Sequence, residues 1–353
     1  MKIILYISQF NKIGGVERFV LNFVKRFPET IVLYDQGKPE IGERINWRNK
    51  YQCDVFISAS AWGKSAFDNI DSKIYVQMVH ADYRAVIEHW VFKYIKHPKT
   101  THHICVSNTV KQGFEEATPY KCDAVFYNFI DNSLKPIEKP KNDVLRLVTL
   151  SRISKEKGFE RMIEFAKKIP VPYVWEFWGD ANTAYAKDVI NKINFKGITT
   201  EPFKEIAKAD YVVQLSDSEG NSCAINEALQ MNTPVLITPF PSGFEQVESG
   251  KNGYFIPFNL NNIDFDSIIN KIPKLKDYKE KTTVKDWIDF FNFALIKYKK
   301  NMVTVKVIAP CQGYKVGDIV EVSKERATNG IDKGLCEVYI EVPAKKATKK
   351  KSK

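Results

Sequence analysis

Two acidic residues, Glu219 and Glu227, lie eight positions apart in a segment of apolar and small polar residues. An ionised carboxylate accepts hydrogen bonds from two donors at once, and a sugar or ribose ring presents its hydroxyl groups in pairs. Two carboxylates at this spacing could therefore hold two hydroxyl pairs of one ligand. An acid that favours a helix N-terminus, followed by a solvated acid on the helix, explains the same spacing. The spacing alone leaves both interpretations open.

The residues around these acids predict a strand, a loop and a helix. Residues 211–215 form a buried apolar run, Asn221 and Ser222 are good N-cap residues, and residues 223–231 are compatible with a helix. Ligands of open α/β sheets bind at the carboxyl ends of strands, and the loop that carries Glu219 follows such an end. Free amides at the start of the helix favour an anion or sugar hydroxyls at this place.

Glycines and basic residues form a second set of candidates. Gly14 and Gly15 follow the first predicted strand and open the first helix, where glycine lets a ligand approach the backbone. An ordinary strand–helix turn explains them too. Arg152 and Lys157 follow the first strand of the second half. A guanidinium and an ammonium can stabilise the charge that a leaving nucleoside diphosphate gains, although a solvated basic loop has the same composition.

Histidines, cysteines and paired aspartates give no convincing metal site in the sequence. All five histidines lie within residues 80–103 without a cysteine pair, and the six cysteines are scattered in the manner of reduced thiols. Asp264 and Asp266 form a D-x-D sequence, but acids at the start of a helix explain it. We therefore expect no cofactor and no metal ion. His80 differs from the other histidines because it ends a predicted strand, where an active cleft is expected.

Two alternations of strands and helices indicate an α/β protein with two parallel, doubly wound sheets. In the first domain, residues 1–133, we predict strands near 2–7, 30–35, 54–58, 73–79, 102–106 and 123–127, and helices near 15–27, 84–96 and 108–117. In the second domain, residues 144–300, we predict strands near 145–150, 173–178, 211–215, 234–238 and 253–256, and helices near 158–168, 202–208, 223–231, 263–272 and 283–299. The polar residues 134–143, with their prolines, form the linker between the two.

The C-terminal part follows a different pattern. Residues 302–343 alternate with the period of strands and predict a small β-rich module, and residues 344–353 predict a disordered lysine-rich tail. The net charge is +11, but six lysines lie in the last nine residues, which leaves 11 − 6 = +5 for the rest. Such a tail contacts polyanions or serves only as a solubilising end.

The length of 353 residues suffices for two domains with full cores. No apolar run is long enough to span a membrane, and the opening strand lacks the cleavage site of a signal peptide. We therefore predict a cytoplasmic protein without a transmembrane segment, and peripheral contact with a membrane stays open.

The segments described above resemble the donor-binding signatures of retaining glycosyltransferases of family 4. These enzymes have the GT-B fold, in which two Rossmann-like domains face a cleft. The resemblance covers residues 1 to about 300. The matching parts are Glu219-Gly220, Glu227-Ala228-Leu229, residues 234–237, the stretch from Arg152 to Gly158 and the loop Gly14-Gly15-Val16-Glu17. Residues 221–224 depart from the family, which more often has an aromatic residue, a glycine and a leucine there.

The resemblance implies transfer of a sugar from a nucleotide-diphosphate sugar to an acceptor hydroxyl, with retention of anomeric configuration and without a metal ion. It implies catalytic roles for Arg152, Lys157, Glu219 and His80. The donor-binding residues that it implies are Gly14, Gly15, Asn221, Ser222, Cys223 and Glu227.

The acceptor is a separate question. The module at 302–343 resembles one that recurs in phage and prophage proteins, which favours a phage protein in the cytoplasm of a bacterial host. A hydroxymethylated base of phage DNA, bound through a basic surface and the tail, is one hypothesis. An envelope glycan or lipid is a second, and an inactive GT-B binding protein is a third. On the acceptor side we predict four residues from the aromatic and basic helix of the first domain and the loop before it: Asp82, Arg84, Trp90 and Lys93.

Overall fold

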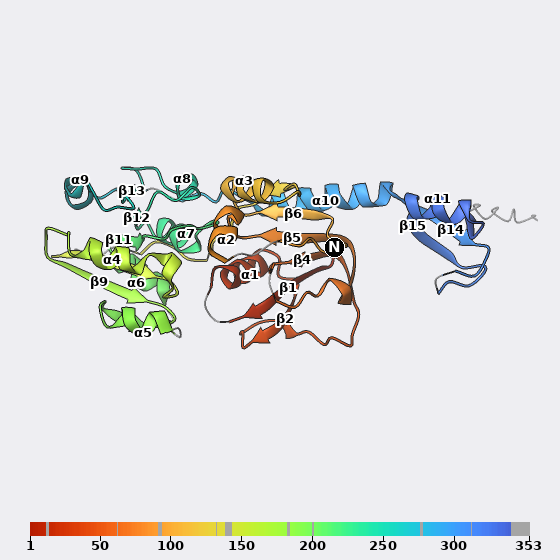
Figure 1. The fold of residues 1–353 in the computed structure, drawn as a ribbon, viewed down its shortest axis with the longest axis horizontal. Helices are drawn as coiled ribbons and strands as arrows, with labels where there is room; N and C mark the ends of the chain where they lie inside the picture. Colours follow the sequence, from red (N-terminus) through yellow and green to blue (C-terminus); the bar gives the residue numbers. More distant parts are fainter. Residues whose placement is uncertain are drawn as a thin grey trace, which may run out of the picture. The chain divides into compact units, whose positions relative to one another are not determined.

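The structure is a computed structural model of the chain, and its elements are labelled in Figure 1. It describes residues 1–11, 14–61, 63–90, 94–131, 133–137, 143–181, 184–199, 201–275, 278–311 and 313–339. The described chain divides into two compact units, Met1–Ile288 and Asp289–Lys353, and each is treated by itself below.

The first unit contains two parallel sheets, of which the first belongs to the N-terminal half. Its strand order is β3-β2-β1-β4-β5-β6-β7, and all of its strand pairs are parallel. The strands are β1 (Ile3–Phe10), β2 (Ile31–Gly37), β3 (Glu43–Arg44), β4 (Tyr51–Ser58), β5 (Ile70–Val79), β6 (His102–Cys105) and β7 (Ala124–Val125). The helices between them are α1 (Gly15–Arg26), the 3₁₀ turn η1 (Phe67–Asn69), α2 (Tyr83–Trp90) and α3 (Asn108–Ala117).

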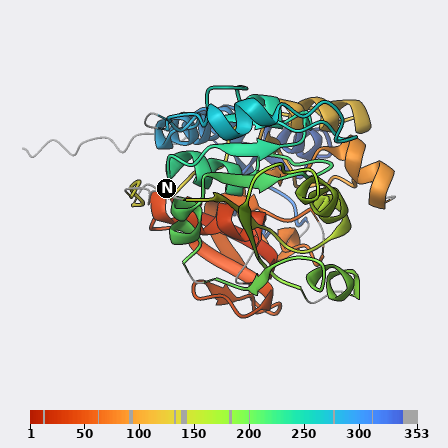
Figure 2. The same ribbon diagram turned by 90° about the vertical axis from the view of Figure 1, so that its left-hand side faces the viewer.

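The second sheet has the strand order β10-β9-β8-β11-β12-β13, and its strand pairs are parallel too. Its strands are β8 (Leu145–Leu150), β9 (Tyr173–Trp178), β10 (Phe195–Gly197), β11 (Tyr211–Gln214), β12 (Val235–Ile237) and β13 (Gly253–Phe255). The helices are η2 (Lys155–Lys157), α4 (Phe159–Ala166), α5 (Ala184–Ile190), α6 (Pro202–Lys208), α7 (Cys223–Gln230), α8 (Gly243–Gln246) and α9 (Phe265–Asn270). Figure 2 looks toward this half, with its strands in green.

Alternate residues of the second sheet serve two hydrophobic cores. Leu147 and Val213 pack with the buried residues of α4 and α5 on one face. Their neighbours Val148 and Val212 pack with α6 and α7 on the other. A parallel sheet that is covered on both faces needs apolar residues at every position, which explains why these strands read as continuous apolar runs. The expectation of two Rossmann-like domains is confirmed.

Helix α10 (Val284–Lys300) follows the second sheet. Trp287, on its first turns, lies with its ring centroid 5.1 Å from that of Phe23 in α1 and 4.6 Å from that of Phe126. Trp287 therefore contributes to the core of the first unit.

The second unit contains a three-stranded antiparallel sheet with the order β15-β14-β16. The strands are β14 (Met302–Val307), β15 (Ile319–Ser323) and β16 (Cys336–Val338), and the helix α11 (Lys324–Asp332) lies between the last two in sequence. The helix begins after Ser323, whose side chain accepts a hydrogen bond from the Arg326 amide. The predicted small β-rich module is confirmed, whereas the predicted tail at 344–353 lies outside the described residues.

Most of the predicted elements are present, but one helix is shorter than expected. The predicted helix 84–96 is helical to Trp90, and residues 94–96 have no helical structure. The Tyr94 ring is buried against Tyr83 and Phe114, and its hydroxyl lies 3.0 Å from His103 Nε2. These contacts hold the chain against β6 and α3. The short elements β3, α5, β10 and α8 were not predicted.

Candidate functional site

A cavity of about 370 Å³ lies between the carboxyl ends of the two sheets of the first unit. We call it the Glu219 cavity. Every residue that the sequence predicted as catalytic or donor-binding lines it: Gly14, Gly15, His80, Arg152, Lys157, Glu219, Asn221, Ser222, Cys223 and Glu227. These residues come from positions up to 213 apart, as 227 − 14 shows, so the fold itself brings them together. Their roles stay predictions.

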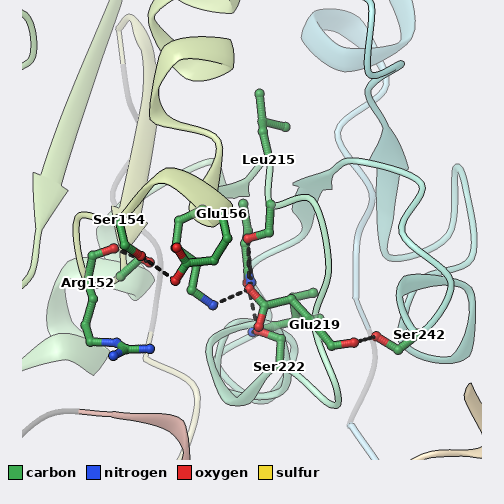
Figure 3. A network of polar contacts seen from close by, with 12 residues as sticks. Arg152, Ser154, Glu156, Leu215, Glu219, Ser222 and Ser242 are labelled. Atoms are coloured by element: carbon green, nitrogen blue, oxygen red, sulfur yellow. Dashed lines mark hydrogen bonds and ion pairs between the residues drawn. The ribbon is translucent and has the colours of Figure 1, made fainter. Parts of the chain in front are cut away.

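Glu219 follows β11 and is held by several donors at one of its oxygens. Its Oε1 accepts hydrogen bonds from Lys157 Nζ at 2.6 Å, from Ser216 Oγ at 2.8 Å and from Gln214 Nε2. Figure 3 shows this arrangement at the start of α7. Its Oε2 has no hydrogen bond to any other described residue, so it keeps its full capacity to accept from a ligand. The acid is thereby oriented before any ligand arrives.

Lys157 and Arg152 differ in how they are engaged. The Lys157–Glu219 pair is largely buried, with side-chain exposures of 17% and 12%. The Arg152 side chain lines the same cavity, and its guanidinium forms no ion pair with the described residues (Figure 3). Across the cavity wall lies Glu17, whose pKa burial raises, although backbone amides and the nearby Arg152 charge oppose the shift. Arg152 is therefore a cation without a fixed partner, available to an anionic group.

Glu227, on the second turn of α7, is buried and faces α1 across the cavity. Arg18 Nε lies 2.9 Å from Glu227 Oε1, but the two atoms are not aligned as a hydrogen bond, so Oε1 lacks a donor among the described residues. Burial raises the pKa of Glu227, and the charge of Arg18 lowers it in part. The guanidinium of Arg18 also lies over the ring of Phe203, 5.7 Å from its centroid.

Sequence reasoning missed Arg18. It lies one helical turn beyond Gly14 and Gly15, on the same side of α1, and it lines the cavity with them. Residues three or four apart share a helix face, so a cation at this spacing was the available signal.

His80 follows β5 and lines the Glu219 cavity. Its Nε2 is buried without a hydrogen-bond partner among the described residues, and its ring packs edge-on against Phe19 with centroids 4.9 Å apart. Burial lowers the pKa of His80 to about 4. The imidazole is therefore neutral at pH 7, with one nitrogen in need of a partner. A buried polar atom of this kind favours a ligand at the site.

Two helix starts meet across the cavity. An added Cβ on Gly14 would lie 2.0 Å from Glu17 Oε2, so the carboxylate of Glu17 packs directly against the start of α1. Ser222 is the N-cap of α7, and its Oγ accepts from the Ile225 amide. Cys223 Sγ lies 3.7 Å from the Gly15 carbonyl oxygen, and burial raises the pKa of this thiol to about 12. The thiol is therefore protonated at pH 7, and free amides from both helices border the space between.

Backbone contacts hold the two halves of the first unit together beside this cavity. An added Cβ on Gly220 would lie 1.9 Å from the His80 carbonyl oxygen. Ser107 Oγ donates to the Gly220 carbonyl oxygen at 2.7 Å. Asn128 donates its amide N–H to Asn221 Oδ1 at 3.2 Å and its Nδ2–H to the Asn221 carbonyl at 2.9 Å. The side chain of Asn221 is therefore engaged with the first domain, while its residue still lines the cavity.

Glu245 on α8 makes a further contact between the halves. Its carboxylate accepts from Thr109 N at 2.7 Å, from Asn108 N at 3.0 Å and from the Tyr127 hydroxyl at 2.7 Å. The first two donors are free amides at the start of α3. Burial raises the pKa of Glu245, but hydrogen bonds from Tyr127 and Thr109 outweigh it, and the pKa is lowered.

Two of the predicted acceptor-side residues, Asp82 and Arg84, lie outside the Glu219 cavity. Asp82 is buried and accepts from Arg84 Nη2 at 2.7 Å, and Arg84 also contacts Glu116 on α3. Trp90 is the last described residue of α2, and Lys93 lies outside the described residues. Among the paired aspartates, Asp264 caps α9 by accepting from the Ser267 amide at 3.0 Å, as the sequence predicted.

A second cavity, of about 590 Å³, adjoins the first. We call it the Asp35 cavity, because Asp35 at the end of β2 lines it. Its other walls come from the carboxyl ends of β1, β4 and β5 and from the second half of the first unit. It shares Gly14, His80 and Arg152 with the Glu219 cavity.

The chain was compared with known proteins. Residues 131–285 match the model of the glycosyl transferases group 1 family. No curated protein sequence matches the chain. Among the described residues, no helix is both long and apolar enough to cross a bilayer.

Several solved structures have a similar fold. HepE of Anabaena, solved with UDP and glucose, superimposes with a TM-score of 0.59 at 16% identity, over 77% of this chain and 92% of that one. WaaG, a glycosyltransferase involved in lipopolysaccharide biosynthesis, gives a TM-score of 0.52 at 11% identity, over 76% and 89%. The lipopolysaccharide outer core galactosyltransferase WaaB gives 0.50 at 13%, over 85% and 98%.

These likenesses confirm the fold that was expected from the sequence. The chain has the GT-B fold, and residues 131–285, which include most of its second domain, match the model of the glycosyl transferases group 1 family.

Proposed function

We propose that this protein transfers a sugar from a nucleotide-diphosphate sugar to an acceptor hydroxyl, with retention of anomeric configuration and without a metal ion. One observation carries the proposal. Arg152 and Lys157 line the same cavity as Glu219 and Glu227, so two cations lie beside two carboxylates at the carboxyl ends of both sheets. Cations suit a diphosphate, and carboxylates suit the hydroxyls of a sugar and a ribose.

The reaction balances without a protein nucleophile. The bond between the anomeric carbon and the diphosphate oxygen breaks, and the electron pair leaves with the nucleoside diphosphate. The acceptor oxygen bonds to the anomeric carbon on the same face, and its proton passes to the departing phosphate oxygen. Arg152, Lys157 and the amides that border Gly15 and Cys223 stabilise the charge on the leaving group.

Two groups suit the transferred sugar. Glu219 Oε2 is unengaged, because the donors from Lys157 and Ser216 bind the other oxygen. His80 Nε2 is buried and has no hydrogen-bond partner in the described part of the chain, and its low pKa leaves the imidazole neutral. A sugar hydroxyl can donate a hydrogen bond to one of these two groups and form a second hydrogen bond with the other. His80 Nε2 would then have a hydrogen-bond partner.

Glu227 is the candidate for the ribose. Its Oε1 lies near Arg18 without an aligned hydrogen bond, so it can still accept from a hydroxyl. The HepE structures contain UDP with glucose or UDP-glucose, which supports a uridine nucleotide as the first donor to try.

The test is diphosphate release from a panel of nucleotide sugars. Lys157→Ala should lower release by about 100-fold or more, because the substitution removes a cation that stabilises the negative charge of the leaving group. Lys155→Ala, an exposed lysine in the same turn, is the matched control and should behave as the wild type. Equal rates for the two variants would contradict the proposed role of Lys157. Retention is checked by NMR of the anomeric proton, and activity in EDTA tests the metal-free proposal.

The same assay, run with different acceptors, distinguishes the two acceptor hypotheses and the inactive binding protein. The hydroxymethylated DNA base stays a prediction, which rests on the phage-like module at 302–343, the basic net charge and the scattered cysteines of the sequence. Transfer to a duplex oligonucleotide with 5-hydroxymethylcytosine, falling steeply with salt, would support it. Transfer to a carbohydrate or lipid would support the envelope hypothesis. No diphosphate release from any donor would leave the inactive binding protein.

A further inference from the structure

We propose that the Asp35 cavity binds the acceptor, and that this acceptor is an uncharged carbohydrate with several hydroxyls. The inference rests on the proposed function of the Glu219 cavity. It excludes a nucleic acid and a phosphorylated chain as the group bound next to the reacting sugar. The argument comes from the position, the charge and the hydrogen-bonding groups of the described lining residues.

Position is the first argument. The two cavities share Gly14, His80 and Arg152, so a molecule in the Asp35 cavity reaches the sugar held in the Glu219 cavity. His80 lines both cavities, and its buried Nε2 has no hydrogen-bond partner among the described residues. At about 590 Å³, the Asp35 cavity falls within the roughly 300–1,000 Å³ of small-molecule sites.

Charge is the second argument. The described lining carries three carboxylates, Glu17, Asp35 and Asp180, against two cations, Lys64 and Arg152. Arg152 belongs to the Glu219 cavity as well, where the diphosphate of the donor would engage it. With donor bound, the remaining balance is negative. A phosphate or carboxylate on the acceptor is then repelled, whereas a neutral molecule is not.

The lysine in this cavity is already engaged. Lys64 Nζ lies 3.6 Å from the centroid of the Trp47 ring, which provides a cation–π contact. Trp47 Nε1 in turn donates to Asp35 Oδ1 at 3.0 Å. One oxygen of Asp35 is thereby fixed, as one oxygen of Glu219 is fixed in the neighbouring cavity. The other can accept a hydroxyl from the cavity.

Hydrogen-bonding groups are the third argument. Gln9 and Gln36, at the ends of β1 and β2, line the cavity with exposed side chains. Each amide offers both donors and an acceptor, which matches the alternating needs of sugar hydroxyls. Tyr83 is the single aromatic residue in the described lining, and it is buried. A site for a nucleobase would instead combine a stacking platform with a positively charged groove.

The experiment uses the full chain and the nucleotide sugar that releases diphosphate fastest in the donor panel. Methyl glycosides of neutral hexoses and disaccharides are compared with matching methyl hexuronides and with a duplex that contains 5-hydroxymethylcytosine. We expect transfer to a neutral glycoside with a kcat/KM at least tenfold above that of its hexuronide. Transfer to the hexuronides or the duplex, with none to any neutral glycoside, overturns the inference.

Asp35→Asn tests the charge directly. The amide keeps an oxygen to accept from Trp47 but removes the charge, so the acceptor KM should rise about tenfold and the preference over the hexuronide should narrow. The KM for the donor should change less. Asp68→Asn, which alters a carboxylate of 80% exposure outside the cavity, is the matched control.

The outcomes separate the two proposals. Unchanged preference in Asp35→Asn, with normal thermal stability, contradicts the inference while the donor chemistry stands. No diphosphate release from any donor, in wild type and variants alike, contradicts the proposed function instead.

Discussion

The Glu219 cavity and the Asp35 cavity hold their polar side chains in different ways. In the first, Glu219 accepts from Lys157, Ser216 and Gln214 at one oxygen, so its geometry is set by the protein. In the second, Gln9 and Gln36 are exposed, and Asp35 is anchored by a side-chain donor from Trp47. A site that stabilises developing charge gains from fixed dipoles, whereas a site that recognises hydroxyls tolerates adjustment. The comparison predicts steep losses in the first cavity and shallow ones in the second.

The largest effect is expected where the fixed pair is broken. Glu219→Gln removes the negative charge that faces Lys157, and with it the carboxylate that accepts a hydrogen bond from the sugar. The kcat should therefore fall by about 1,000-fold. Diphosphate release measures it. Glu164→Gln, an exposed acid on α4, serves as the control. A loss below tenfold would remove the contrast between the two cavities.

A slightly smaller loss of kcat should follow from displacing the loop of Glu219 from the first domain. Gly220→Ala places a Cβ against the His80 carbonyl oxygen, so the loop of Glu219 must move away from the first domain. A displacement of about 1 Å costs on the order of 100-fold in rate. Gly250→Ala, which adds backbone strain at φ +77° with open space around it, is the control for stability. Equal kcat in the two variants would show that this contact does not set the geometry.

Arg18→Gln sharpens the comparison through pH. Burial raises the pKa of Glu227, Arg18 and Lys25 lower it, and Asp131 raises it further. Without Arg18 the pKa should rise, so the ionised acid that accepts from a ribose forms only at higher pH. The donor KM near the acid limit should rise about tenfold, and the acid limb of kcat/KM should move to higher pH. Arg44→Gln, with an exposed side chain on β3, should leave the profile in place. An unshifted limb in Arg18→Gln would separate Glu227 from donor binding.

The smallest effect is expected at Glu245, which lies outside both cavities. Because the pKa of Glu245 is lowered in the folded protein, its carboxylate stabilises the folded chain at pH values above its ordinary pKa of 4.5. This stabilisation is lost as the pH falls through the pKa of the folded state. Glu245→Gln should cost about 2 kcal/mol at pH 7, because charged hydrogen bonds to α3 become neutral ones. Denaturant unfolding at pH 7 and at pH 4 measures it. The difference in the free energy of unfolding between variant and wild type should be smaller at pH 4 than at pH 7. An equal difference at the two pH values would contradict this account.

Much of the fold could be predicted from the sequence, because buried parallel strands are continuous apolar runs. Residues 145–150 and 173–178 are examples whose bounds match the structure. The helix predicted at 84–96 is present as α2, but its predicted end at 94–96 is wrong, because the Tyr94 ring packs against Tyr83 and Phe114, contacts that no local pattern reports. The short helix α5 was missed because its seven residues carry too few periodic positions.

The site was predictable where a motif carries it. Arg152, Lys157, Glu219 and Glu227 were named from their segments, and they line one cavity. Arg18 was missed because its partner lies 209 positions away (227 − 18). The Asp35 cavity was missed for the same physical reason. Its polar groups come from the ends of separate strands, one or two from each, so no spacing along the chain marks them.

The indole rings offer a way to watch each cavity alone. Trp47 stacks under Lys64 beside Asp35, whereas Trp178 lines the Glu219 cavity with its Nε1 buried and unpartnered among the described residues. Emission from an indole responds to nearby charge and to loss of water. Replacing the other tryptophans with phenylalanine would leave one fluorophore per cavity. Titrations with nucleotide and with glycoside would then report which cavity binds its ligand first. They would also report whether binding in one cavity shifts the emission wavelength of the tryptophan at the other.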